Sequence, residues 1–162
     1  MRRNTIVSSV ALAIGMLAAG SVQALGRAEV RYIEPERFTD AGFGIMERDR
    51  TQGLLTRQIE RLAQQLPDGQ VLKVEVTDVD LAGEIDWLSP QRLRVMGQLP
   101  DAPQLSLRFE LTQDGQVVAR GEDRLRDLGY LHRRAGLDGR AALPYESRML
   151  SEWFQTRFSV ER

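Results

Sequence analysis

The sequence predicts an α+β domain: one mostly antiparallel sheet of about five strands with two helices packed on one face. Three observations predict it. An apolar pattern of helical period follows the first short strand, alternating apolar and polar residues fill the middle of the chain, and a broad apolar stripe lies near its end. The expected order is β-α-β-β-β-β-α. No repeat, low-complexity tract or linker divides residues 25–162, so we expect a single domain there.

The first 24 residues have the layout of a cleavable signal peptide. Arg2 and Arg3 form a short positive start, an uncharged apolar run covers residues 5–20, and small residues lead up to Ala24. The alternative is an uncleaved membrane anchor. The run is short for a span of about 20 residues, and two glycines weaken it as a helix. We therefore expect cleavage after Ala24 and export out of the cytoplasm.

Composition narrows the partners of the exported chain. The absence of cysteine excludes a lipid anchor at the cleavage site and any disulfide. Of the 22 Lys and Arg residues, Arg2 and Arg3 lie before the cleavage point, and no acidic residue does. This leaves 20 basic against 23 acidic side chains, a formal charge of −3. Such a balance argues against a general nucleic-acid binder. We expect no permanent membrane anchor either.

The first two elements are a strand and a helix. Residues 27–33 alternate as a short strand that Pro35 ends, and the turn-rich residues 37–44 read as a loop. A helix is predicted over residues 50–66, with Thr51 as a possible N-cap. Its apolar face consists of Leu55, Ile59, Leu62, Ala63 and Leu66.

Two further strands follow the helix. Residues 71–79 alternate as a half-buried strand, and the helix before them allows a parallel pairing with the first strand. Residues 81–90 are predicted to be a connector, and residues 92–99 a short third strand.

The fourth and fifth strands are predicted to form a hairpin around Asp114-Gly115. A two-residue loop would place Arg120 opposite Phe109, and directly opposed residues share a face, so a charge would enter the core. A three-residue loop, Gln113 to Gly115, opposes Ala119 to Phe109 instead. We therefore predict the three-residue loop. The two strands cover residues 105–111 and 117–126.

Pro144 is predicted to open the last helix as its first residue. Tyr145, Met149 and Trp153 recur every four residues within a wider apolar stripe, which indicates a core-facing surface rather than a ligand site.

Nucleophilic and His- or Cys-based metal chemistry find little support. His132 is the only histidine, no serine lies in a Gly-x-Ser-x-Gly elbow, and there is no cysteine. We interpret His132 as a solvated loop residue. No catalytic, cofactor-binding or metal-binding residue is assigned, and no cofactor is expected.

The acidic segment at the end of the second strand is the one speculative functional segment. Asp78 and Asp80 lie two residues apart, hence on one face if the strand continues, and Glu84 follows just beyond. Such carboxylates can hold a hard cation or act as a general acid/base pair. They do not fit a calcium-loop pattern, and carboxylates at a strand end also cap turns. Both interpretations stay open.

Three stretches resemble the bacterial family called domain of unknown function 3016. They are Phe38-Thr39-Asp40-Ala41, residues 72–84 (LKVEVTDVDLAGE) and residues 145–154 (YESRMLSEWF). The resemblance implies a small exported proteobacterial protein located in the periplasm, and it brings no activity or cofactor. Residues 127–130 (DLGY) are similar too, except that Gly129 stands where a polar side chain is expected.

Three functions compete. The first is a non-catalytic envelope module that binds a protein partner or a small ligand. The second is a hydrolase or metal-assisted enzyme that uses Asp78, Asp80 and Glu84, which requires these carboxylates to converge in a cleft. The third is an inhibitor of a secreted hydrolase that inserts a loop such as residues 133–143. The sequence leaves the oligomeric state open.

Overall fold

A computed structural model describes residues 25–90, 93–97, 101–133 and 141–158. The predicted signal peptide, residues 1–24, lies outside the described residues. So does most of the loop considered for an inhibitor, residues 133–143. Neither helix in the described part of the chain is long and apolar enough to cross a membrane.

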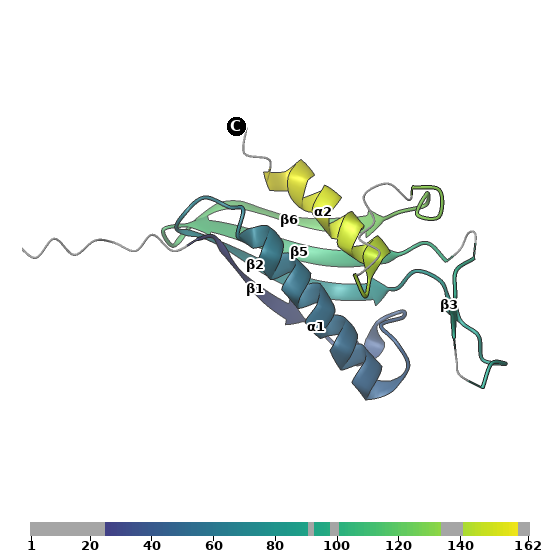
Figure 1. Ribbon diagram of the computed structural model, residues 1–162. Coiled ribbons are helices and arrows are strands. Elements are labelled where there is room, and N and C mark those ends of the chain that lie inside the picture. Colours follow the sequence, from purple (N-terminus) through teal and green to yellow (C-terminus); the bar gives the residue numbers. More distant parts are fainter. Residues whose placement is uncertain (1–24, 91–92, 98–100, 134–140, 159–162) are drawn as a thin grey trace, which may run out of the picture.

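The main sheet has the strand order β1-β2-β5-β6. Strand β1 pairs in parallel with β2, and the other neighbours are antiparallel. Helices α1 and α2 cover one face of the sheet (Figure 1). The predicted fold class and the parallel first pair are confirmed. The strands are β1 (Arg27–Tyr32), β2 (Gln70–Asp80), β5 (Gln104–Gln113) and β6 (Gln116–Arg126), and the helices are α1 (Gly44–Ala63) and α2 (Pro144–Phe158).

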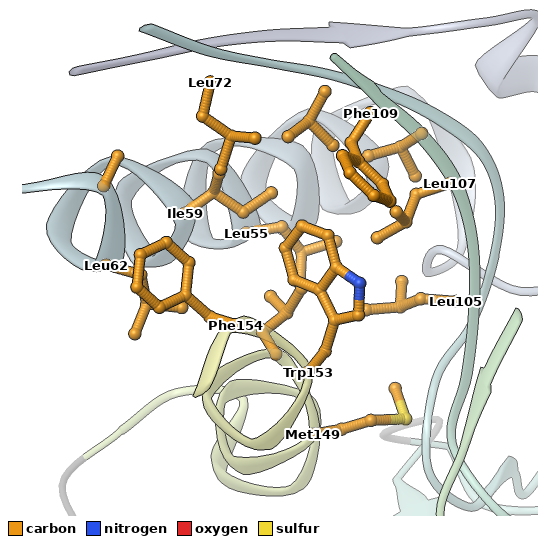
Figure 2. Packing of buried hydrophobic residues seen from close by; sticks show 14 of the residues in the cluster. Leu55, Ile59, Leu62, Leu72, Leu105, Leu107, Phe109, Met149, Trp153 and Phe154 are labelled. Atoms are coloured by element: carbon orange, nitrogen blue, oxygen red, sulfur yellow. The ribbon is translucent and has the colours of Figure 1, made fainter. Parts of the chain in front are cut away.

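The core fills the space between the two helices and the sheet. Leu55 and Ile59 of α1 are almost fully buried there, and the ring of Trp153 on α2 meets that of Phe109 edge to face at 5.9 Å between centroids (Figure 2). The register of β2 shifts after Val76, so the residues that face the core change from even to odd positions. Burial of this apolar surface stabilises the fold without disulfides.

The third predicted strand does not join the main sheet, and that part of the prediction is wrong. Residues 94 and 95 form β4 (Arg94–Val95), which pairs with β3 (Glu84–Ile85) in a separate two-stranded sheet. The predicted connector therefore supplies half of a hairpin that projects from one end of the molecule (Figure 1). Residues 91–92 and 98–100 lie outside the description.

Helix α1 begins at Gly44, six residues before the predicted start. The Glu47 side chain accepts a hydrogen bond from the backbone N–H of Phe43 at 2.7 Å, which satisfies a donor that the helix start would otherwise leave unpaired. Thr51 is therefore not an N-cap: it lies inside the helix and is buried. The helix ends at Ala63, three residues before the predicted end.

The β5–β6 hairpin has a two-residue loop, so the predicted three-residue loop is wrong. Asp114 and Gly115 both have positive φ, as a type I′ turn requires. A β-bulge at Val118 then adds one unpaired residue to β6 and shifts the register beyond it. Because of the bulge, Phe109 lies opposite Gly121 and no charged side chain is forced against it.

The sheet face opposite the helices carries an alternating pattern of charges. Residues of unlike charge are paired across all three strand boundaries. Several are in ionic contact, such as Lys73 Nζ and Glu110 Oε1 at 3.6 Å. One row runs Glu29, Lys73, Glu110, Arg120, and the next runs Arg31, Glu75, Arg108, Glu122.

Candidate functional site

A cleft of about 650 Å³ opens where β2 ends. Its walls come from the segment before α1, the end of β2 and the β3 strand. The backbone of Asp40 continues the parallel pairing of β1: its N–H donates to Val79 O at 2.8 Å, and its carbonyl accepts from Leu81 N–H at 3.0 Å. This pairing sets Asp40 directly beside Asp80.

Arg94 neutralises the Asp40 carboxylate. Its two terminal nitrogens donate to the two Asp40 oxygens at 2.8 and 3.1 Å, a bidentate pair. The same guanidinium donates to the carbonyls of Gly83 at 2.7 Å and Ala82 at 3.4 Å. Arg94 thereby fastens the base of the β3–β4 hairpin to the cleft wall.

Asp80 lies beside the ion pair of Arg94 and Asp40, but its own surroundings differ from those of Asp40. Its side chain is half-buried, and no described residue donates a hydrogen bond to it. Burial raises the pKa of Asp80 above its ordinary value, and the neighbouring carboxylates of Asp40 and Asp78 raise it further. Arg94 and Arg126 act in the opposite direction but do not outweigh these effects, so the described residues compensate the charge of Asp80 only in part.

The three predicted acidic residues separate. Asp80 and Glu84 both line the cleft, and Glu84 is exposed. Asp78 does not line it: its two oxygens accept hydrogen bonds from the backbone N–H and the hydroxyl of Thr39 at 2.8 and 2.9 Å. Asp78 therefore has the turn-capping role, and Asp80 and Glu84 are the members that a ligand could reach.

The cleft combines negative charge with aromatic walls. Its lining contains five acidic residues, whereas Arg48 is the basic residue in the described lining. The rings of Phe43 and Trp87 meet edge to face at 5.4 Å between centroids on its rim. Aromatic faces attract cations, and so do uncompensated carboxylates. The five acidic residues are Glu36, Asp40, Asp80, Glu84 and Asp101.

A buried carboxylate supports the cleft from behind. Glu146 of α2 is 2% exposed and accepts the backbone N–H of Ala82 at 2.8 Å. Burial raises the pKa of Glu146. The contact holds residue 82 in place, and the carbonyl of that residue accepts one of the Arg94 hydrogen bonds.

A second charged cluster joins the end of β6 to α2. The Asp127 carboxylate is buried and accepts Arg148 Nη2 at 2.6 Å and Arg133 Nη2 at 3.0 Å. Arg148 also donates to the carbonyl of Arg133, and Arg133 pairs with Glu152 at 3.1 Å. Burial alone would raise the pKa of Asp127, but the two arginines outweigh it and hold the pKa below its ordinary value. This cluster is packed rather than open.

The remaining candidate groups are not drawn together. His132 is exposed in the loop after β6, as expected. Within the described ranges, no three His, Cys, Asp or Glu side chains are grouped so that they could hold a metal ion.

A family model described as protein of unknown function (DUF3016) matches residues 26–156. The chain belongs to the DUF3016 family. Comparison with curated proteins finds no match. The resemblance predicted from the sequence is therefore confirmed, and the chemistry of this DUF3016 protein has to be argued from its own side chains.

The stretches that resembled DUF3016 contain several residues of both charged clusters. Asp40, Glu146 and Arg148 lie within them, and this was the signal that could have pointed to these residues. The periodicity of the chain gave no sign of Arg94. At Gly129, where a polar side chain was expected, an added Cβ would approach its nearest neighbour, Asp127 Oδ1, at an ordinary 3.8 Å. The fold of this DUF3016 protein therefore has room for a Cβ at this position.

Proposed function

We propose that this protein is an exported, non-catalytic binding module of the periplasm whose cleft takes a positively charged ligand. The single observation that carries the proposal is Asp80, a half-buried carboxylate without a hydrogen-bond donor among the described residues, inside an acidic cleft. A ligand cation would supply the missing partner. The volume of about 650 Å³ lies within the range of about 300–1,000 Å³ found for ligand sites.

The geometry favours binding over a hydrolase that uses Asp78, Asp80 and Glu84. An acid/base pair needs two carboxylates that are free to exchange protons with a substrate. Asp78 is occupied by Thr39, and Asp40, the other carboxylate beside Asp80, is occupied by Arg94. The three carboxylates of the hydrolase hypothesis therefore do not converge: Asp78 lies outside the cleft, and Glu84 is exposed to solvent.

The binding site is tested by thermal melting with putrescine, spermidine and agmatine as probes. A ligand that binds only the folded state raises the midpoint, by an amount that corresponds to about 2.7 kcal/mol at a hundredfold excess over Kd. We expect at least one probe to raise it. Asp80→Asn should abolish the increase. Asp68→Asn, the same change at the opposite end of β2, should leave it intact. Equal responses of the two variants, or no response to any probe, would refute the proposal.

The proposed location in the periplasm is tested in a separate experiment. The full chain is expressed in a Gram-negative host, and the mass of the product in the periplasmic fraction is measured. The layout of residues 1–24 predicts a product that begins at Leu25. A product that keeps these residues, or that stays in the cytoplasm, would contradict export.

A further inference from the structure

Five large apolar side chains are exposed at the start of α1 and beyond β3, and two of them, Phe43 and Trp87, line the cleft. Phe43, Ile45 and Met46 lie at the start of α1 and are 45%, 71% and 87% exposed. Trp87 and Leu88 lie beyond β3 and are 64% and 95% exposed. The rings of Phe43 and Trp87 are in contact and so connect the two segments, and we name these five residues the apolar tip. The start of α1 and the β3–β4 hairpin lie at the same end of the molecule (Figure 1).

The apolar tip lies outside the hydrophobic core. None of its five residues belongs to the core between the helices and the sheet or is among the partly buried residues packed against it. Scattered exposed apolar residues are normal, but a contiguous group rimmed by polar residues marks an interaction surface. Tryptophan is also among the residues that contribute most to binding energy in protein interfaces.

The turn that carries Trp87 and Leu88 is held in shape. Asp86 Oδ1 accepts a hydrogen bond from the backbone N–H of Leu88 at 2.9 Å. The backbone carbonyl of Asp86 accepts one from the backbone N–H of Ser89 at 3.2 Å. These bonds place Trp87 and Leu88 at the two central positions of a tight turn. A preorganised turn loses less conformational entropy on binding than a flexible one. The two side chains are therefore presented outward at low cost.

The negative charge of the cleft distinguishes between three possible ligands of this surface: a lipid bilayer, a second copy of this protein and another polypeptide. The acidic cleft next to the apolar tip repels a bilayer with anionic headgroups. In a symmetric dimer through this surface, each copy would face the same carboxylates, which disfavours a second copy. A basic and apolar polypeptide is complementary to both parts at once.

Building on the proposed function, we infer that the cleft and the apolar tip together bind a polypeptide segment. An arginine or lysine side chain of the segment enters the cleft toward Asp80, and the apolar residues beside it cover Trp87 and Leu88. A small cation would fill only the cleft. A protein partner accounts for the exposed apolar tip as well.

The test starts with selection from a random peptide display library. The full chain, purified after export, is the target, and the Trp87→Ser/Leu88→Ser variant serves for counter-selection. We expect enriched sequences to carry a basic residue between apolar ones. Binding of an enriched peptide, followed by fluorescence anisotropy, should weaken about tenfold, which equals 1.4 kcal/mol, in the tip variant and in Asp80→Asn. Replacing its basic residue with neutral citrulline should weaken binding by a similar factor.

The control variant is Val117→Ser, which removes an exposed apolar side chain on β6, away from the tip. It should bind as the wild type does. No enrichment, or enriched sequences without a basic residue, would overturn the inference. So would binding to phosphatidylglycerol vesicles, or self-association, that is lost in the tip variant. If small cations still bind through Asp80 in any of these cases, the proposed function stands and only the peptide inference fails.

Discussion

Replacement of Asp127 with Asn tests the buried cluster between β6 and α2. Asp127 and Arg148 are 5% and 8% exposed, and their side chains meet at 2.6 Å. The substitution keeps the shape but removes the negative charge, so the Arg148 guanidinium stays buried without its counter-ion. Breaking such a pair costs about 3–5 kcal/mol. Asn can still accept the Gly129 N–H as Asp127 does, so we expect the lower end, about 3 kcal/mol.

The difference in the free energy of unfolding between the wild type and Asp127→Asn should depend on pH, and this dependence identifies its cause. The pKa of Asp127 is lowered in the folded state, so its stabilisation is complete above the unfolded value of about 3.9 and is lost as the pH falls through the folded pKa. Asn resembles protonated Asp. The deficit of the variant should therefore be largest near neutral pH and shrink below about pH 4.

Urea denaturation, followed by circular dichroism at several pH values, measures this free energy. The midpoint of thermal unfolding should fall by about 10–15 °C at neutral pH for a chain of this size. Glu152→Gln is the control: it removes an exposed partner of Arg133 and should cost at most about 1 kcal/mol. A deficit of Asp127→Asn below about 1 kcal/mol, or one that is equal in acid and at neutral pH, would refute this account of the cluster.

Three further predictions concern other parts of the molecule. Because the folded pKa of Asp80 is raised, the stability that its protonation provides is lost as the pH rises, so Asp80→Asn should raise the thermal midpoint near neutral pH and lose this advantage in acid. An equal or lower midpoint at neutral pH contradicts this. Gly121→Ala should cost about 1–3 kcal/mol in urea denaturation, because the new Cβ would lie 2.9 Å from the Phe109 ring. Adding Phe109→Leu should make the alanine less costly, and additive losses would count against the close contact. Acrylamide should quench the fluorescence of the exposed Trp87 but not that of the buried Trp153, so Trp87→Phe should remove most of the quenching.

The predictions that succeeded rest on patterns that persist along the chain. The period of α1 and the alternation of β2 report which face is buried, and burial on one face of a sheet is what defines the fold class. The hairpin loop failed for a local reason. The prediction assumed that the side chains of β6 alternate between the two faces of the sheet without interruption from the loop onward. In the structure the bulge at Val118 adds one residue and thereby keeps the charged side chains off the core face. No short-range pattern marks that position.

The candidate site was predicted in part. The spacing of Asp78 and Asp80 pointed to the strand end at which the cleft opens. It did not reveal that Thr39 hydrogen-bonds to Asp78, whereas Asp80 lines the cleft. Arg94 reaches Asp40 across 54 positions of sequence, and that contact depends on the complete tertiary fold. The apolar tip escaped prediction because its residues do not contribute to the core, so the periodicity that reveals core positions does not register them.

The alternating charges on the open face of the sheet bear on how the strands find their partners during folding. A slip of one residue is prevented by the apolar face, since it would turn the core residues outward. A slip of two residues keeps that face intact, and only the charged face can oppose it. Between β2 and β5 it would set Lys73 against Arg108 or Glu75 against Glu110, depending on its direction. The same holds at the other two boundaries, where either slip opposes like charges. Each misplaced pair costs about 0.2–1 kcal/mol. The two faces thus divide the selection of register between them, odd slips being rejected by the core and even slips by the charges that face the solvent.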